Sequence, residues 1–282
     1  MNILFLGYLT PILRAAFNKK NIKIIGVGIE IDNLQSKEIR KFCLKNNIYK
    51  FNAKNINNNI NLKKLIKKTD LIIVAAFSQL ISNSVISKIK RGIINFHPSL
   101  LPNYKGRSPL EEQIIRREKN GGITFHWMKE KFDEGPIVIQ KKIKIEINDD
   151  YQKLLKKCVS CGAVTIDKLL TTNIEKWKST YPKEKGSYYY ARKKNDALIN
   201  FNDNFIEIQN IFKTFNWRKW VHIEFKDKKL LINYVKKISK SNKGVNGKII
   251  SIMPKIIIKC NDYLIEIKGK NLKTILNKGD KI

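Results

Sequence analysis

The segment GIINFHPSLLPNYKG (92–106) begins as a short apolar strand and ends in polar residues and prolines. Side chains two positions apart on a strand point the same way, so Asn95 and His97 share one direction as the strand ends. Pro98 biases His97 toward an extended backbone, and Pro102 closes a loop that cannot continue the strand. The segment therefore predicts an amide and an imidazole presented together at one edge of a sheet.

Apolar runs on the amino-terminal side place this strand in an alternating α/β pattern. Apolar residues recur at helical spacing in 36–46, and continuous apolar strands occur at 2–6, 22–27 and 71–75. Continuous apolar strands between helices indicate a mostly parallel sheet that is covered on both faces. We therefore expect a Rossmann-like α/β domain, in which ligands bind at the carboxyl ends of the strands.

The glycine motifs of nucleotide-binding α/β proteins are missing. The first strand runs into LGYLTP (6–11), which lacks the G-x-G-x-x-G turn, and no G-x-x-x-x-G-K-S/T occurs. These motifs let the backbone approach phosphates closely, so their absence disfavours a dinucleotide cofactor and a P-loop NTPase.

The pattern changes after a polar stretch at 180–194. Residues 201–215 predict a helix that Asn204 caps, and five short alternating runs follow it. Several short strands with turn signals suggest a small antiparallel barrel. We expect two domains, a catalytic domain at 1–184 and an OB-like domain at 185–282.

Composition and cysteine usage favour a cytoplasmic protein with no membrane partner. Apolar residues make up 43% of the 282 residues, but no apolar run approaches the roughly 20 residues of a membrane span. The amino-terminal strand lacks the features of a signal peptide. Cys158 and Cys161 form a C-x-x-C in a helical pattern without a second ligand pair nearby, so we expect no metal.

The formal net charge of +32 has two interpretations. It favours polyanionic partners such as tRNA, nucleotides or polyglutamylated folate. Yet 48 of the 56 basic residues are lysines, and they are spread along the whole chain together with abundant Asn and Ile. That profile indicates a codon bias of the whole proteome rather than a dedicated nucleic-acid surface.

A further polar position follows another strand about thirty residues later. GGITFHWM (121–128) runs into KEKFDEGP (129–136), which places Asp133 in a loop with Gly135 and Pro136 at its turn. Taken singly, a strand-end Asn or His is more often a structural hydrogen-bonding residue, and such an Asp is usually a turn residue. The combination is far more specific.

Together these residues resemble the motif of the folate-dependent formyltransferase family. The family pattern N-x-H-x-S-L-L-P, followed by an aspartate in a D-x-G loop, reads NFHPSLLP at 95–102 and DEG at 133–135. YYYARKKNDALINF (188–201) and the closing strands resemble the carboxy-terminal domain of the longer family members. The resemblance covers the entire chain and implies a Rossmann-like domain plus a small OB-like barrel.

The resemblance implies an enzyme that moves a formyl group from 10-formyltetrahydrofolate to a primary amine. Attack by the amine creates an oxyanion, which needs fixed hydrogen-bond donors. We expect the Asn95 amide and a protonated His97 to supply them. Asp133 would orient the imidazole, favour its charged form, and accept the proton of the amine directly or through water.

The resemblance also implies a pterin site between the loop after the third strand and the loop of Asp133. Ordinary loop packing is the alternative role for each candidate side chain. The candidates are Phe77, Ser78, Gln79, Leu80, Ile81 and Phe132.

Structural roles are expected for the remaining histidines and for the tryptophans. His126 lies mid-strand, where it can line the same cleft, and His222 begins a barrel strand. In FNWRKW (215–220) the chain departs from the Pro-rich segment of family members, which makes acceptor contacts there doubtful.

Two acceptors remain open. The connection after the second strand is short and contains Glu30 and Asp32, whereas the tRNA enzymes of the family typically carry a long basic loop there. YKGRSPLEE (104–112) resembles the enzymes that act on UDP-linked amino sugars, and Arg107 stands where the tRNA enzymes more often have alanine. We therefore expect a nucleotide-linked amino sugar (UDP- or dTDP-linked) as acceptor, with methionine on initiator tRNA as the alternative.

Two further classes stay open. A hydrolase that releases formate from the same folate uses this scaffold, although such hydrolases usually carry an amino-terminal regulatory domain. A non-catalytic folate-binding relative is disfavoured by the intact Asn95, His97 and Asp133. The sequence is compatible with a homodimer but does not define the oligomeric state.

Overall fold

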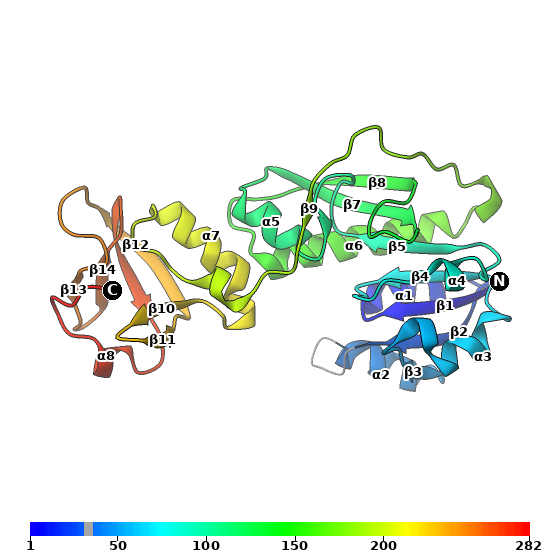
Figure 1. Ribbon diagram of the computed structural model, residues 1–282, viewed down its shortest axis with the longest axis horizontal. Coiled ribbons are helices and arrows are strands. Elements are labelled where there is room, and N and C mark those ends of the chain that lie inside the picture. Colours follow the sequence, from blue (N-terminus) through cyan, green and yellow to red (C-terminus); the bar gives the residue numbers. More distant parts are fainter. Residues whose placement is uncertain (31–35) are drawn as a thin grey trace. The chain divides into compact units, whose positions relative to one another are not determined.

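The computed structural model describes residues 1–30 and 36–282, which form two compact units (Figure 1). The first unit comprises residues 1–109, 119–145 and 155–190. The second unit comprises residues 110–118, 146–154 and 191–282.

A seven-stranded sheet is the frame of the first unit (Figure 1). Its strands, in sheet order, are β3 (Lys50–Asn52), β2 (Lys23–Ile29), β1 (Asn2–Gly7), β4 (Leu71–Ala75), β5 (Ile93–His97), β7 (Asn120–Trp127) and β8 (Ile137–Lys144). The pairs from β3 to β5 are parallel, and β7 and β8 add antiparallel pairs. Because β4 is buried along its whole length, its sequence is a continuous apolar run rather than an alternating one. The expected α/β domain with a mostly parallel sheet is confirmed.

Helices and short turns connect these strands. The α-helices are α1 (Thr10–Phe17), α2 (Lys37–Lys45), α3 (Ile60–Ile66), α4 (Asn83–Ile86) and α6 (Tyr151–Leu169), which starts in the second unit, and the 3-10 turns are η1 (Ile56–Asn58) and η2 (Ile174–Lys176). A separate two-residue ladder pairs β6 (Lys105–Gly106) with β9 (Tyr188–Tyr189) in parallel. This ladder joins two segments that are about eighty residues apart in the sequence.

Antiparallel sheets dominate the second unit, as expected for its carboxy-terminal part. They are a hairpin of β10 (His222–Phe225) and β11 (Lys228–Leu231), and a sheet of β12 (Tyr234–Lys240), β15 (Tyr263–Lys268), β14 (Ile256–Lys259) and β13 (Ile249–Ser251), in that order. The helical elements are α5 (Pro109–Ile115), η3 (Lys194–Ala197), α7 (Phe205–Phe215), η4 (Asn216–Arg218) and α8 (Leu272–Ile275). The predicted helix at 201–215 is α7.

Buried ion pairs hold α5 within the second unit. Arg192 donates from Nε to the buried Glu112 carboxylate at 2.6 Å, and Arg218 Nη2 lies 3.3 Å from Glu111 Oε1. Burial raises the pKa of Glu111 even though Arg218 lies beside it. A buried carboxylate without such a partner is strongly unfavourable, so the two arginines secure α5 to the rest of the unit.

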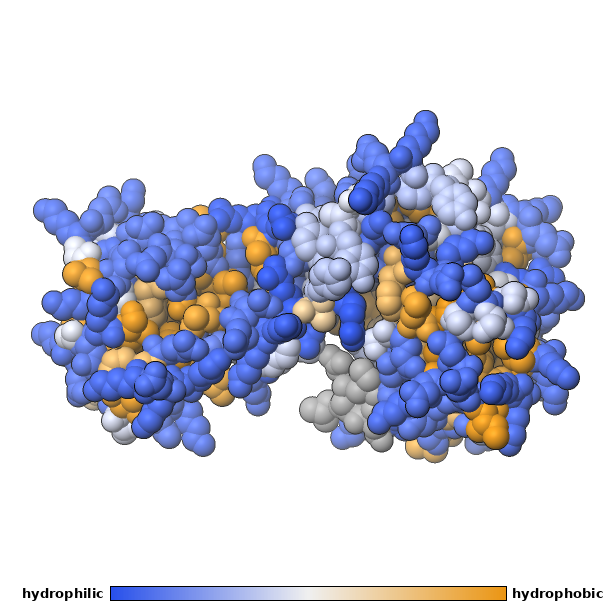
Figure 2. Space-filling model, in the orientation of Figure 1, coloured by the Kyte–Doolittle hydropathy of each residue, from blue (hydrophilic) through white to orange (hydrophobic). Residues whose placement is uncertain are grey.

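Hydrophilic residues cover most of the face seen in Figure 2, as the abundance of lysine requires. Across residues 1–30 and 36–282, no helix is both long and apolar enough to cross a lipid bilayer.

The start of α7 provides a test of the predicted cap. The Asn204 side chain accepts a hydrogen bond from the Glu207 backbone N–H, and the Glu207 carboxylate accepts one from the Asn204 N–H. Asn204→Ala should lower the free energy of unfolding by about 1 kcal/mol, measured by urea denaturation. Asn204→Ser keeps an oxygen acceptor and should stay close to the wild type. Equal loss in both variants would contradict a capping role.

Candidate active site

The carboxyl end of β5 presents the two polar residues of the motif on one face of the sheet. In the antiparallel pairing of β5 with β7, Asn95 lies opposite His126 and His97 lies opposite Thr124. Phe96, between the motif residues, points to the other face, where a Cβ on Gly162 of α6 would lie 2.5 Å from its ring. The alternation of the strand therefore directs Asn95, His97 and His126 away from α6.

Asp133 completes this cluster from the loop after β7. Its Oδ1 lies 3.4 Å from Asn95 Nδ2, 3.4 Å from His97 Nδ1 and 3.3 Å from His126 Nε2. The backbone N–H of Gly106 donates to its Oδ2 at 2.8 Å. The three residues of the sequence motif thus lie together, with His126 as a fourth member.

The backbone of the loop is shaped to hold this carboxylate. Asp133 has a φ of +55°, a region that Asp tolerates better than most side chains. A Cβ added at Gly135 would lie 1.6 Å from the carbonyl oxygen of Trp127, so only glycine fits there. The D-x-G spacing therefore reflects a close backbone approach as well as a turn.

His97 is buried, and the contacts of its ring define its neutral tautomer. Nε2 lies 2.7 Å from the carbonyl oxygen of Tyr104, which can only accept, so Nε2 carries the proton and donates. Nδ1 faces the Asp133 carboxylate. Burial lowers the pKa of His97, although Asp133 and the Tyr104 carbonyl oppose the shift. The neutral imidazole is therefore favoured near pH 7, against the expectation of a protonated His97 that donates to an oxyanion.

Asp133 is an anion at neutral pH. Burial alone would raise its pKa, but His97, His126 and the Gly106 N–H outweigh burial and lower the pKa to about 2. The Gly106 N–H donates to this carboxylate whether or not the imidazoles are charged.

Aromatic and basic side chains lie beside the cluster on the ladder of β6 and β9. Tyr104 and Tyr189 stack with ring centroids 5.5 Å apart, and Tyr188 meets Tyr190 edge to face at 5.1 Å. Burial and the Asp133 carboxylate raise the pKa of Tyr188, whereas Arg107 lowers it. Tyr188 thus lies within electrostatic reach of both Asp133 and Arg107.

The side chains expected to contact a pterin differ in their exposure and in their hydrogen bonds. Ile81 is fully buried in the core, and Phe77 packs against that core, whereas Leu80 is exposed and Phe132 is half-buried. Gln79 accepts from the Ile56 N–H at 2.9 Å and donates to the Ala53 carbonyl at 2.8 Å. These local bonds leave the Gln79 side chain less available than a surface glutamine.

Glu30, the acidic residue directly after β2, has a structural role. The Glu30 carboxylate accepts from the Ser78 N–H at 2.8 Å and from its Oγ at 2.6 Å, which ties the end of β2 to the loop after β4. Asp32 lies outside the described residues. The carboxylate of Glu30 thus has hydrogen-bond partners within the protein. This structural role weakens the argument that an acidic residue at this position indicates an amino sugar rather than tRNA.

The cysteines are free thiols, and burial raises the pKa of Cys43 to about 11. Cys158 is buried in α6, and Cys161 is half-buried. In the described part of the chain, no group of three or more Cys, His, Asp or Glu side chains has the arrangement of a metal site.

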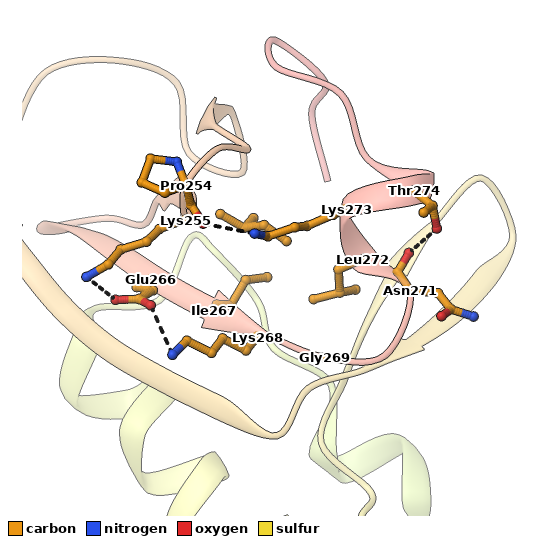
Figure 3. A pocket seen from close by; sticks show the side chains of 11 residues that line it. Pro254, Lys255, Glu266, Ile267, Lys268, Gly269, Asn271, Leu272, Lys273 and Thr274 are labelled. Atoms are coloured by element: carbon orange, nitrogen blue, oxygen red, sulfur yellow. Dashed lines mark hydrogen bonds and ion pairs between the residues drawn. The ribbon is translucent and has the colours of Figure 1, made fainter.

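A cavity of about 530 Å³ lies in the second unit and contains no residue of the motif (Figure 3). Lys255 and Lys268 pair with the buried Glu266 at 3.3 and 3.5 Å, and Lys273 donates to the Pro254 carbonyl at 2.9 Å. Its basic side chains are therefore already engaged with the protein.

Family models match two parts of this chain. The family model "Formyl transferase" matches residues 28–165, and "Formyl transferase, C-terminal domain" matches residues 192–275. The methionyl-tRNA formyltransferase of Methylacidiphilum infernorum is 30% identical over 223 residues, which are 76% of this chain and 69% of that protein. The bifunctional polymyxin resistance protein ArnA of Wigglesworthia glossinidia brevipalpis is 33% identical over 92% of this chain. The chain spans only 41% of the length of ArnA.

Solved structures share the fold. WlaRD, a sugar 3N-formyl transferase solved with dTDP and 5-N-formyl-THF, has a TM-score of 0.68 at 21% identity, over 96% of this chain and 98% of that one. An N-formyltransferase from Helicobacter canadensis, in complex with folinic acid and dTDP-3-aminofucose, has a TM-score of 0.68 at 18% identity, over 95% and 98%. With the family models and the M. infernorum relative, the chain belongs to the folate-dependent formyl transferase family.

Proposed function

We propose that this chain transfers a formyl group from 10-formyltetrahydrofolate to the primary amine of a nucleotide-linked amino sugar. The cluster of Asn95, His97 and Asp133 at the end of β5 carries the proposal. It combines an amide donor and a neutral imidazole, each 3.4 Å from one oxygen of an ionised carboxylate. Acyl transfer to an amine is accelerated by a general base and by a donor to the developing oxyanion, which groups of these kinds can supply.

The reaction assigns a task to each side chain. The amine nitrogen bonds to the formyl carbon, the bond from that carbon to the folate nitrogen breaks, and one proton passes from the amine to that nitrogen. Neutral His97 accepts the amine proton at Nδ1, and Asp133 stabilises the resulting imidazolium. The Asn95 amide donates to the oxyanion that develops on the formyl oxygen.

Observations beside the cluster support a sugar nucleotide as the acceptor. The rim of Tyr188, Tyr190 and Arg107 offers rings for stacking a base and a guanidinium for a diphosphate. The solved structures described above were obtained with dTDP or a dTDP-sugar, and one curated relative is ArnA.

The runner-up is the formylation of methionine on initiator tRNA. Several curated relatives are methionyl-tRNA formyltransferases, and residues 228–281 contain fourteen lysines against three acidic residues. A basic domain of this kind attracts RNA as well as nucleotides.

An acceptor assay separates these functions. The purified chain is incubated with 10-formyltetrahydrofolate and a UDP- or dTDP-linked amino sugar or Met-tRNA, and the products are measured by mass spectrometry. We expect tetrahydrofolate and the N-formyl sugar in equal amounts. Formylated Met-tRNA alone would establish the runner-up. Acceptor-independent formate release would indicate a hydrolase, and no turnover would refute the proposal.

Removal of the carboxylate charge tests the proposed chemistry. Asp133→Asn should lower kcat by about 10²- to 10⁴-fold, because the His97 imidazolium loses its counter-ion. Asp227→Asn is the matched control, since Asp227 is an exposed aspartate with a similar φ of +61°. Wild-type turnover of Asp133→Asn would exclude the carboxylate from the reaction.

The lowered pKa of His97 predicts a pH dependence of stability. The unfolded chain binds a proton at His97 near pH 6.5, whereas the folded chain resists it, so stability falls as the pH drops below about 6.5. Between pH 7.5 and 5.5, the Tm of the wild type should fall more than that of His97→Gln, which has no titrating group there. Equal falls in both proteins would mean that His97 titrates normally in the folded state.

A further inference from the structure

A row of three side chains runs across the sheet beside the cluster. In the strand pairing, Thr124 of β7 lies opposite His97 of β5 on one side and Gln140 of β8 on the other. Residues directly opposite each other on neighbouring strands point to the same face of a sheet. Thr124, which is fully buried, therefore stands between the imidazole and Gln140 on the face that carries the cluster.

The Thr124 hydroxyl is fully used in hydrogen bonds with Gln140 and with the loop at 98–104. Its one hydrogen points to the Ser99 carbonyl oxygen at 2.6 Å. Its oxygen accepts from the Leu101 N–H at 3.1 Å and from Gln140 Nε2 at 2.9 Å. Gln140 Nε2 also donates to the Leu101 carbonyl oxygen at 2.7 Å. A hydroxyl offers one hydrogen and two lone pairs, so Thr124 fixes the loop at two residues and has no hydrogen bond left for a substrate.

The same loop carries the carbonyl that accepts from His97. Ser99 Oγ donates to the Asn103 carbonyl oxygen at 2.7 Å and, at 3.5 Å, toward that of Tyr104. Tyr104 has a φ of +60°, which is unfavourable for a tyrosine, so contacts with the rest of the structure must hold it there. Its carbonyl oxygen lies 2.7 Å from His97 Nε2. A continuous chain of hydrogen-bonded residues thus links Thr124, through Ser99 and Tyr104, to the imidazole.

Two acceptors compete for the single proton of the neutral His97 ring. The Tyr104 carbonyl oxygen lies 2.7 Å from Nε2, and the Asp133 carboxylate oxygen lies 3.4 Å from Nδ1. A carboxylate is the stronger acceptor at equal distance, so the Nε2–H tautomer depends on the carbonyl being held close. If the carbonyl moves away, the proton is drawn to Nδ1, and the ring no longer has a lone pair there.

We propose that Thr124 is a positioning residue that fixes the loop at 98–104, holds the Tyr104 carbonyl against His97 Nε2 and so keeps Nδ1 free to accept a proton. Gln140 supports it by donating to the hydroxyl and to the loop. Thr124 acts only through His97, because its own hydroxyl is fully used within the protein. The consequence for turnover rests on the proposed formyl transfer, whereas the tautomer does not.

A set of substitutions separates positioning from packing. Thr124→Val keeps the shape of the buried side chain but removes the hydroxyl, whereas Thr124→Ser keeps the hydroxyl. Gln140→Leu removes one donor and leaves the hydroxyl in place, so it takes over the test if Thr124→Val does not fold. Thr165→Val is the matched control, because Thr165 is a buried threonine of α6 whose hydroxyl also donates to a carbonyl, that of Cys161 at 2.8 Å.

The kinetic readout is kcat together with the KM of both substrates. Thr124→Val should lose about 10- to 10²-fold in kcat with little change in KM, because only the Nε2–H tautomer leaves a base at Nδ1. Thr124→Ser should restore most of this loss, Gln140→Leu should lose less than Thr124→Val, and Thr165→Val should match the wild type. Wild-type kcat in folded Thr124→Val, or an equal loss in Thr165→Val, would overturn the proposal.

A spectroscopic measurement reports the tautomer without any turnover. The chain has three histidines, so the ring nitrogens of the ¹⁵N-labelled protein give a simple long-range ¹H–¹⁵N spectrum, which His222→Leu and His126→Gln variants assign. At about pH 8, above the ordinary pKa of an imidazole, we expect the Nε2–H tautomer of His97 in the wild type and in Thr124→Ser, and a shift toward the Nδ1–H tautomer in Thr124→Val.

Two spectra would overturn the proposal. One is an Nδ1–H tautomer of His97 in the wild type. The other is an unchanged Nε2–H tautomer in folded Thr124→Val or, if that variant does not fold, in Gln140→Leu. If the wild type transfers no formyl group, the proposed function fails and the spectrum alone decides the role of Thr124.

Discussion

The site is organised around one buried anion, the carboxylate of Asp133. An ionised carboxylate away from water is unfavourable unless donors surround it. The Gly106 N–H and the Asn95 amide donate to it, and the rings of His97 and His126 lie within 3.4 Å of it, so three separate segments of the chain meet at this carboxylate. Three segments therefore have to come together. The D-x-G loop carries the carboxylate, the end of β5 carries the Asn95 amide, and the β6–β9 ladder positions the Gly106 N–H.

Much of this frame follows from local patterns. Continuous apolar runs gave the parallel strands, because a strand buried on both faces has no polar side to alternate with. Asn204 indicated the start of α7, because an asparagine at the N-cap satisfies a backbone donor of the first turn. Period-two geometry alone put Asn95 and His97 on one face. These features depend on residues that are neighbours in the sequence.

Features that depend on distant pairing could not be predicted in this way. His126 joins the cluster because it lies opposite Asn95 in an antiparallel pair, and no pattern within either strand reveals that register. The hydrogen bond from His97 Nε2 goes to the backbone carbonyl of Tyr104, and the sequence contains no signal for such a bond. Nothing local in 110–118 indicates that this segment belongs with residues from 191 onward, because buried ion pairs between α5 and two distant arginines make that connection.

The loop after β4 illustrates a related limit. Its sequence suggests five side chains available to a pterin, but loop side chains also satisfy the backbone around them. Ser78 binds Glu30, Gln79 bridges Ile56 and Ala53, and Ile81 fills the core. A loop that binds a ligand must be held in one conformation. Several of its side chains are used for contacts within the protein, so fewer remain to contact the ligand.

The net charge acts on a different length scale from the cluster. A field from 48 lysines accelerates encounter with any polyanion, so it attracts a sugar nucleotide and a tRNA alike. At physiological ionic strength such fields fade over about 8 Å, whereas the acceptor amine must reach bonding distance of the formyl carbon. Selection between the two acceptors must therefore come from side chains that contact the bound acceptor, and we propose Tyr188, which interacts with both Asp133 and Arg107, for this role. The chemistry that we propose for Asn95, His97 and Asp133 is the same for either amine, so the proposed centre leaves the choice of acceptor to the side chains around it.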